Sequence, residues 1–305
     1  MSSTLEEELK TLMNGGAIPV PETYDVSSGN PQPLRLRRNA CYIVMGVILN
    51  EQDEVLMMQE AKAECWGSWY LPAGRLEKDE TLVEGLCREV KEETGLLCEP
   101  LTLLTVEERG TAWIRFVFLA QHTGGSLKTT LLSDSESLQA MWWDMSSALP
   151  LRCKDILPLI QLGQAFRLLP SHPSILPALL PSPHLAMRLV LLCLGSQEEM
   201  WILQSLTEPP HLPVTGSGPC RGSILTSLRS MLEEDPPQYC GILGIQHQGG
   251  EGADGVCFNI MAGLNAPQPP VMTSKALSWV LVQDGELKDK MKHILENKTL
   301  LPLYT

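Results

Sequence analysis

The sequence predicts an α+β fold arranged as two units that follow one another along the chain. Runs of β-branched and apolar residues recur in both halves, separated by stretches with the apolar spacing of a helix. The length of 305 residues is typical of about two domains, and a hydrophobic fraction of 44% is enough for well-buried cores. Prolines recur every few residues between positions 149 and 183, which favours a semi-rigid connection between the two units.

Residues 1–34 are expected to form a leader that ends in a linker. The acidic, amphipathic start favours a short helix around 5–13, and the turn-rich sequence SSGNPQPL at 27–34 is typical of a linker. The first domain is expected over residues 35–165. It opens with two β-rich runs in the segment 40–61, joined by NEQDE, which is the pattern of a β-hairpin.

The remaining elements of this domain follow in chain order. The segment WGSWYLPAG at 66–74 ends in a proline and a glycine, and it leads into a loop followed by a helix that ends near Thr94. Residues 101–110 and 113–122 indicate two strands with a turn between them. A closing strand is expected within 136–150 and a closing helix within 153–169.

Residues 166–184 are expected to be a proline-rich linker whose leucines pack against a domain, followed by a smaller α+β domain at 185–305. This domain repeats the element order of the first one, beginning with a hairpin pattern at 187–206. The segment 211–235 aligns with 70–94 when Leu212 is placed on Leu71. The aligned pairs in this register are Arg229 with Arg88, Ser230 with Glu89, Glu233 with Glu92, and Glu234 with Glu93.

The second domain is therefore interpreted as a degenerate repeat that keeps the skeleton of the first. Because Ser230 replaces an acidic residue in this register, we expect it and its neighbours to bind no catalytic metal. The domain would then stabilise the protein, mediate dimerisation or shape the active site. The sequence contains no signal for the oligomeric state.

Charge limits the class of partner. The formal net charge is −13, so a nucleic-acid polymer or an anionic membrane would be repelled except at a local basic patch. The patch RLRRN at 35–39 is either a solvated edge before a strand or a site for a small anionic ligand. The apolar run 189–194 is too short to span a bilayer, and no secretory signal is visible. Nine cysteines without a C-x-x-C pair indicate reduced thiols, so a cytoplasmic location is expected.

Three glutamates are predicted to crowd together on one helix. Glu89, Glu92 and Glu93 have the spacing i, i+3 and i+4, which places them within one turn. Like charges at this spacing destabilise a helix by roughly a few tenths of a kcal/mol per pair. One explanation is an acidic amphipathic helix. The other is a divalent cation, because clustered carboxylates are the hard oxygen ligands that suit Mg²⁺ or Mn²⁺.

The wider pattern favours the cation. The segment 74–96, GRLEKDETLVEGLCREVKEETGL, fits G-x5-E-x7-R-E-U-x-E-E-x-G-U at every specified position, where U is a bulky apolar residue. This is the Nudix box, and the chain resembles the Nudix hydrolase family, which implies a mixed β-sheet between helices. The matching positions are Gly74, Glu80, Arg88, Glu89, Val90, Glu92, Glu93, Gly95 and Leu96.

Four of these residues have structural roles that follow from their chemistry. Gly74 is expected to let the backbone turn closely between a strand and the box loop. Gly95 is well placed as a left-handed cap at the end of the helix. Arg88 is expected to pair with Glu80 and so to hold the loop against the helix.

The family resemblance implies the catalytic roles. Glu89, Glu92 and Glu93 would bind Mg²⁺ or Mn²⁺, and Glu89 would activate a water that attacks a diphosphate linkage, with Arg88 in the same catalytic group. Nudix hydrolases often take a further carboxylate from a late loop. Glu136 is the candidate for it, and the alternative is a surface acid before a strand.

Stretches outside the box, such as LLTVEERG and RFVFLAQHTGG, resemble Nudix hydrolases that act on small-molecule nucleotides. The implied reaction is hydrolysis of oxidised purine nucleoside diphosphates (8-oxo-dGDP, 8-oxo-GDP and 8-oxo-dADP) to the monophosphate and phosphate. ADP-ribose or a nucleotide sugar is the alternative substrate. An alternative of another class is a non-catalytic nucleotide-binding scaffold.

Aromatic and polar residues near the box are the candidates for substrate binding, because aromatic faces can stack on a base. Leu56 would line a base pocket, Arg75 would touch a phosphate, and Asp144, if protonated, would donate a hydrogen bond to a purine edge. For each tryptophan the alternative is a core position. The candidates are Leu56, Trp69, Tyr70, Arg75, Trp143 and Asp144.

Overall fold

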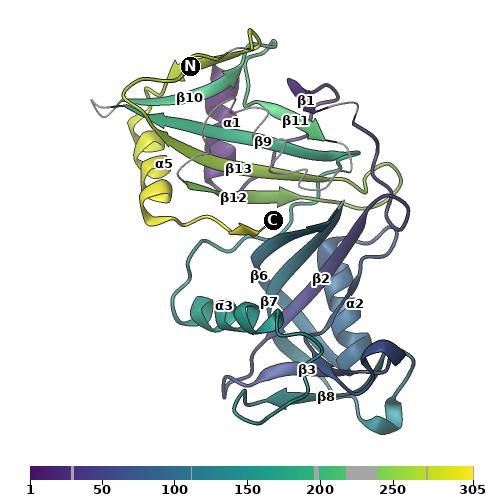
Figure 1. Ribbon diagram of the computed structural model, residues 1–305. Helices are drawn as coiled ribbons and strands as arrows, with labels where there is room; N and C mark the ends of the chain where they lie inside the picture. The colour runs from purple at the N-terminus through teal and green to yellow at the C-terminus, as the bar shows by residue number, and fades with distance from the viewer. Residues whose placement is uncertain (29–30, 111, 196–198, 218–238, 273, 305) are drawn as a thin grey trace.

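The computed structural model describes residues 1–28, 31–110, 112–195, 199–217, 239–272 and 274–304. Five strands form the central sheet of the first unit (Figure 1), in the order β15-β6-β7-β2-β5. β2 runs parallel to β7, and β6 runs antiparallel to β7, so the sheet is mixed. These strands are β2 (Cys41–Ile48), β5 (Ala73–Arg75), β6 (Leu96–Gly110), β7 (Trp113–Gly125) and β15 (Leu303–Tyr304).

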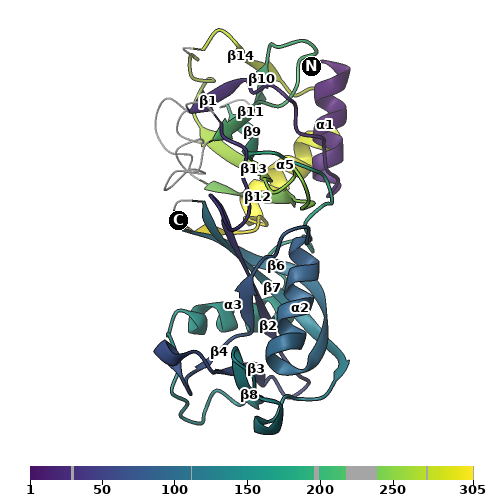
Figure 2. The ribbon, with the colours of Figure 1, turned by 90° about the vertical axis from the view of Figure 1, so that its right-hand side faces the viewer.

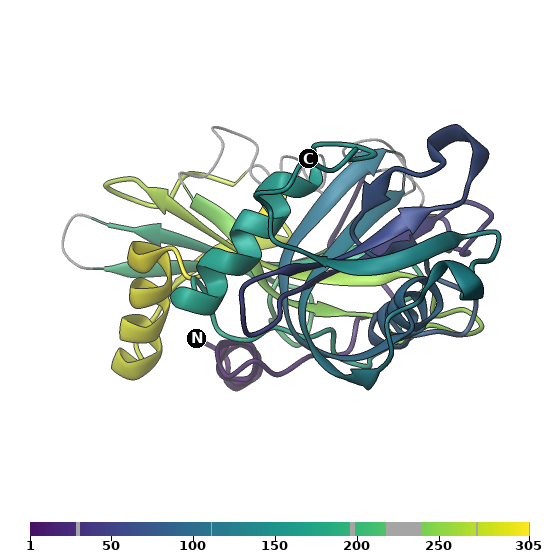
Figure 3. The ribbon, with the colours of Figure 1, turned by 90° about the horizontal axis from the view of Figure 1, so that it is seen from below.

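Two helices cover the two faces of this sheet, α2 (Leu82–Thr94) and α3 (Ile156–Leu168). Successive residues of a strand point to opposite faces, and β2 shows this directly. Val44 belongs to the same buried cluster as Leu86 of α2, whereas Val47 belongs to the cluster that contains Ile160 of α3. The sheet therefore lies between the helices (Figure 3), and the predicted fold class is confirmed.

The predicted hairpin at 40–61 is wrong in its pairing. β2 is already bonded to β5 on one edge and to β7 on the other, so its edges are not free for β3 (Val55–Glu60). β3 instead forms a separate antiparallel sheet with β4 (Trp69–Tyr70) and β8 (Ser137–Trp143). Only the bridge between Leu49 and Val55 connects the two predicted arms. Short 3₁₀ turns lie at Ala63–Cys65 and Thr130–Leu132.

The second unit repeats the strand pairing of the first. β9 runs antiparallel to β11 and parallel to β13, which pairs with β12, just as β2 runs antiparallel to β5 and parallel to β7, which pairs with β6. β14 pairs with β10 as β8 pairs with β3, and a helix, α5, then follows. The elements are β9 (Leu185–Leu194), β10 (Met200–Ser205), β11 (Val214–Ser217), β12 (Tyr239–Gln246), β13 (Val256–Asn265), β14 (Leu277–Leu281) and α5 (Gly285–Asn297).

The segment that aligns with the Nudix box lies outside the described residues. Arg229, Ser230, Glu233 and Glu234 all fall within 218–238, so the expectation that this segment binds no catalytic metal stays a prediction. The predicted hairpin at 187–206 is confirmed, since β9 and β10 pair directly through Leu194 and Met200.

The leader expected at 1–34 is instead a part of the second unit. α1 (Ser3–Met13) buries Leu5, Leu9 and Leu12 in a cluster with residues of α5 (Figure 2). β1 (Val26–Ser28) then adds a parallel strand beside β11. The spacing of the three leucines is that of one helix face, and such a face is stable only when another element covers it.

The junction between the units is one continuous apolar core. Val44 pairs with Phe116 in the first sheet and Met187 pairs with Phe258 in the second. β5 pairs with β2 at Val44, and β11 pairs with β9 at Met187. Phe116 and Phe258 therefore occupy equivalent places in the repeat. Their rings are stacked, with centroids 6.4 Å apart and an interplanar angle of 8°.

Two extended segments connect the units further. The proline-rich stretch packs against both units, since the backbone amide of Leu103 donates to the carbonyl oxygen of Ile175 and Ala178 bridges to Gln246. The predicted role of its leucines is wrong, because the buried residue is Ile175, whereas Leu176 and Leu179 are exposed, as are Leu168 and Leu169. At the end of the chain, Leu303 pairs with Val106 and so places β15 at the edge of the first sheet. Among the described residues, no helix is long and apolar enough to cross a membrane.

We predict that Phe258→Ala destabilises both units together. The ring is fully buried in the shared core, and such a truncation lowers the free energy of unfolding by about 3–5 kcal/mol. Urea unfolding followed by tryptophan fluorescence measures this, with Val271→Ala, which changes a side chain 94% exposed, as the control. A separate transition of the first unit at its original midpoint would contradict the shared core.

Candidate active site

The box helix α2 has well-defined ends. At its start, Thr81 accepts a hydrogen bond from the amide of Glu84, and Glu84 accepts one from the amide of Thr81, which forms a capping box. At its end, Gly95 adopts φ 76°, so the predicted left-handed cap is confirmed. A Cβ at Gly95 would also meet the carbonyl oxygen of Ser126 at 2.3 Å, which leaves glycine as the residue that fits.

Arg88 is the centre of a hydrogen-bonded network between the box loop and the helix. Its guanidinium donates to both carboxylate oxygens of Glu80, at 2.6 and 3.0 Å, so the predicted pairing is confirmed. The same group donates to Glu89 at 2.8 Å, to Glu92 at 3.0 Å and to the carbonyl oxygen of Arg75 at 3.1 Å. One arginine therefore fixes the loop, the neighbouring strand and two of the box acids.

Three carboxylates converge beside this network. Glu89, Glu92 and Glu136 each offer an oxygen, and these atoms all lie within 4.8 Å of one another. We call these three residues the acidic site. Glu136 comes from the loop before β8, where its backbone amide donates to Asp134 at 2.9 Å. The late-loop acid suggested by the sequence thus lies beside two of the three box acids.

Gly74 is required for close approach to Glu89. A Cβ built on Gly74 would lie 2.0–2.1 Å from the carboxylate atoms of Glu89. The backbone of Gly74 has no unusual φ; it is a residue of strand β5, paired with Val44. The predicted role as a tight turn is therefore corrected: the glycine makes room for a carboxylate.

Glu93 stands apart from the acidic site. It is 2% exposed, and its carboxylate accepts a hydrogen bond from the amide of Ala73 at 2.8 Å. Burial raises the pKa of Glu93 well above its ordinary value. The charge of the nearby Glu89 adds to this rise in pKa, and the predicted role of Glu93 as a metal ligand stays a prediction. Its contact holds Ala73, and thereby positions the neighbouring Gly74.

Glu89 is the most buried member of the acidic site, at 6% exposure. Burial raises the pKa of Glu89, the Arg88 guanidinium opposes this shift, and the charges of Glu136 and Glu92 add to it. The repulsion expected from the sequence is therefore present in the fold. A cation bound among these oxygens would relieve it.

A cavity of about 840 Å³ opens over the acidic site, and we call it the acidic cavity. Tyr70 and Arg75, two of the substrate-binding candidates, line it. Cationic residues that were not predicted to bind substrate also line the cavity. Of these, Arg115 could have been recognised in the sequence, because it interrupts the apolar run WIRFVF in β7. These additional residues are Lys62, Arg109, Arg115 and Arg152.

The other four substrate-binding candidates do not line this cavity. Leu56 is fully buried, and Trp69 and Trp143 are 6% and 5% exposed, because all three pack in the apolar clusters. Asp144 is exposed and accepts hydrogen bonds from Ser146 and Ser147. The bonds from Ser147 and then Ser146 lower the pKa of Asp144, so the protonated form needed to donate to a purine edge is disfavoured.

The second unit reaches the site at the box loop. The loop between β12 and β13 brings Gly249 against Glu80, where a Cβ would lie 2.3 Å from the Glu80 carbonyl oxygen. In the same loop, Asp254 accepts a hydrogen bond from the amide of Leu36 at 3.0 Å. The box loop is thus held by Arg88 on one side and by the second unit on the other.

Comparisons with known proteins agree with this geometry. Residues 41–161 match the family model described as NUDIX domain. The chain is 44% identical to the 8-oxo-dGDP phosphatase NUDT18 of Mus musculus, covering 97% of each chain. It is 45% identical to the protein of that name from Homo sapiens over 90% of each chain. For the Danio rerio protein the identity is 41%, over 99% of this chain and 98% of the relative.

The chain belongs to the Nudix hydrolase family. Members of this family generally use a divalent metal. The matched lengths cover 97% and 99% of this chain, so they include both units.

We predict that Gly74→Ala weakens binding of a divalent cation by about tenfold to a hundredfold, because the new methyl group displaces the Glu89 carboxylate. Titration with Mn²⁺ followed by electron paramagnetic resonance measures the affinity. Gly244→Ala is the matched control, since its Cβ would meet nothing closer than Asn259 at 3.7 Å. Equal Mn²⁺ affinity in the two variants would show that Glu89 does not contribute to the site.

Proposed function

We propose that the protein hydrolyses oxidised purine nucleoside diphosphates, with 8-oxo-dGDP as the principal substrate, to the monophosphate and phosphate. The observation that carries the reaction is the convergence of Glu89, Glu92 and Glu136 beside Arg88 in a cavity large enough for a nucleotide. The substrate class is supported by the near full-length similarity to three proteins named 8-oxo-dGDP phosphatase.

The residues of the acidic site fit a divalent cation. Three carboxylate oxygens within 4.8 Å of one another form the oxygen-rich donor set that Mg²⁺ or Mn²⁺ requires, with room for water and phosphate oxygens. Glu89, Glu92 and Glu136 would hold it. The chemistry supplied by such a cation is polarisation of the phosphoryl oxygens and neutralisation of the charge on the leaving phosphate.

The protein's own residues orient the reactants. Glu89 accepts the proton of the attacking water, whose oxygen forms a bond to one phosphorus of the diphosphate. The bridging P–O bond then breaks, and its electron pair stays with the leaving phosphate. Arg88 keeps the Glu89 carboxylate in place through the 2.8 Å hydrogen bond, and Gly74 leaves the space that this carboxylate occupies.

The proposed partner is a small-molecule nucleotide, and a nucleic-acid polymer is disfavoured by the net charge of −13. Action in the cytoplasm, on free nucleotides, is part of the proposal. Removal of oxidised purine diphosphates would prevent their conversion to triphosphates and so protect the nucleotide pool.

We expect the purified protein to release monophosphate and phosphate from 8-oxo-dGDP in Mg²⁺, and to cleave dGDP, 8-oxo-dGTP and ADP-ribose much more slowly. EDTA should abolish the activity, and added Mg²⁺ or Mn²⁺ should restore it. Chromatography of the products measures each reaction. Preferential cleavage of ADP-ribose would overturn the substrate, and the absence of metal-dependent cleavage would favour a nucleotide-binding scaffold.

Two single substitutions test the acidic site itself. Glu92→Gln and Glu136→Gln should each lower kcat/KM for 8-oxo-dGDP by at least about a hundredfold, because each removes a charge from the cation site. Glu64→Gln, which changes an exposed acid outside the acidic cavity, is the control and should leave kcat/KM unchanged. If Glu136→Gln kept full activity, Glu136 would have no part in the site.

A further inference from the structure

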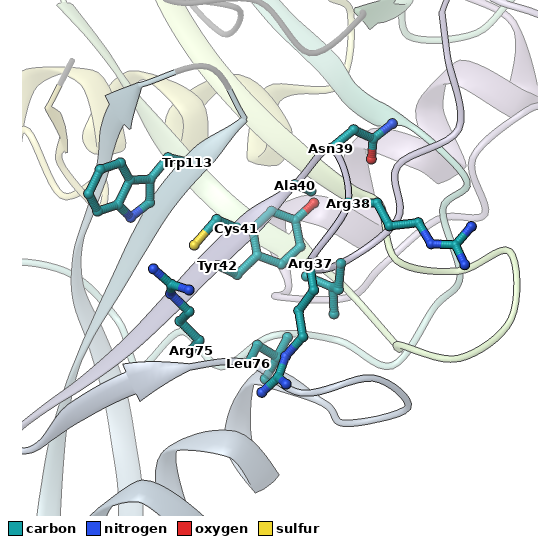
Figure 4. A pocket seen from close by; sticks show the side chains of 10 residues that line it. Arg37, Arg38, Asn39, Ala40, Cys41, Tyr42, Arg75, Leu76 and Trp113 are labelled. Carbon is teal, nitrogen blue, oxygen red and sulfur yellow. The ribbon is translucent and has the colours of Figure 1, made fainter. Parts of the chain in front are cut away.

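A second pocket, of about 710 Å³, lies beside the acidic cavity (Figure 4). We call it the arginine pocket. Its lining includes Arg37, Arg38, Tyr42, Arg75 and Trp113, and Figure 4 shows the side chains of Arg75 and Trp113 near Cys41. The volume is within the range of small-molecule sites, which is about 300–1,000 Å³.

The two pockets adjoin one another. Arg37, Arg75 and Trp113 line both of them. Arg75 follows Gly74, and its carbonyl oxygen accepts a hydrogen bond from Arg88, the same residue that binds Glu89 and Glu92. A molecule whose phosphates lie at the acidic site can therefore extend past Arg75 into the arginine pocket.

The segment RLRRN forms a fixed turn at this pocket. Asn39 accepts a hydrogen bond from the amide of Arg35 and donates to the carbonyl oxygen of Pro33, so its amide group is already used. Arg37 adopts φ 63°, a left-handed conformation that is uncommon for residues other than glycine. Tertiary contacts maintain such a conformation, here including the bond from Leu36 to Asp254 of the second unit.

The side chains of Arg75 and Trp113 are available to contact a ligand in these pockets. Trp113 is 47% exposed although its neighbour Ile114 is fully buried, so the ring stands at the mouth of both pockets. Within the described part of the chain, no carboxylate forms an ion pair with the Arg75 side chain. An exposed indole beside a free guanidinium is suited to stack a base and to contact its phosphate.

The cationic residues further along the lining of the acidic cavity differ in this respect. Arg115 forms ion pairs with Glu107 and, at 2.9 Å, with Asp155. Arg109 reaches the same two carboxylates at 3.2 and 3.3 Å. These charges are engaged with one another, so a nucleotide is less favoured beside Arg115 and Arg109 than beside Trp113 and Arg75.

We propose that the arginine pocket binds the nucleoside part of the substrate, with the purine stacked on Trp113 and Arg75 beside the phosphate attached to the sugar. This inference rests on the proposed function and adds to it the residues that bind the substrate. It also gives the RLRRN segment a function, since the turn places Arg37 at the rim of the pocket.

The test compares Trp113→Leu with the wild-type protein and with Trp66→Leu, which changes a 68% exposed tryptophan that lines neither pocket. Trp113→Leu should raise KM for 8-oxo-dGDP by about tenfold, the size of effect typical of base stacking, with kcat within about twofold of wild type. Calorimetric titration with 8-oxo-dGMP should show a matching loss of affinity. Trp66→Leu should behave as wild type, and equal melting temperatures of the three proteins exclude a folding defect.

The outcomes separate this inference from the proposed function. If wild type cleaves 8-oxo-dGDP and Trp113→Leu has an unchanged KM and affinity for 8-oxo-dGMP, the pocket assignment is wrong and the reaction stands. If wild type does not cleave 8-oxo-dGDP but binds 8-oxo-dGMP in a Trp113-dependent way, the pocket is supported and the proposed reaction fails. Loss of kcat with unchanged KM would also overturn the pocket assignment.

Discussion

The active site depends on the gathering of like charges in a small, partly buried volume. Glu89, Glu92 and Glu136 lie within 4.8 Å of one another, and Glu89 is 6% exposed. Such an arrangement is unfavourable without a counter-charge. Arg88 supplies part of it through bonds to Glu89 and Glu92, and a divalent cation would supply the rest. Gly74 follows from the same constraint, because the backbone of β5 must leave room for the Glu89 carboxylate.

The second unit supports the catalytic unit structurally. It repeats the strand pairing of the catalytic unit, and the equivalent phenylalanines Phe116 and Phe258 stack where the two sheets meet. The shared core ties the stability of the catalytic unit to its partner, and the loop that carries Gly249 and Asp254 rests on the box loop and on the RLRRN turn.

Much of the fold and of the catalytic centre follows from local patterns in the sequence. The box helix, its Gly95 cap and the bond from Arg88 to Glu80 depend on residues near in sequence, and the structure contains all three. The pairing of the hairpin at 40–61 and the separation of the leader at 1–34 from the second unit were wrong, because pairing and burial in these segments depend on distant strands and helices. The helix predicted around 5–13 is present as α1. The burial of Leu56, Trp69 and Trp143 could not be predicted for a similar reason. An aromatic or apolar residue gives no local sign of which face of its strand will be covered. Trp113 was missed because its exposure arises only where β7 meets the RLRRN turn.

Crystals soaked with Mn²⁺ would show whether a divalent cation binds at the acidic site, since anomalous scattering locates the metal without reference to activity. We expect an anomalous peak at coordination distance from oxygens of Glu89, Glu92 and Glu136, on the side of Arg88 that faces the acidic cavity. A peak bound instead by residues of the second unit, or no peak at the acidic site at saturating Mn²⁺, would show that the three carboxylates do not form the cation site.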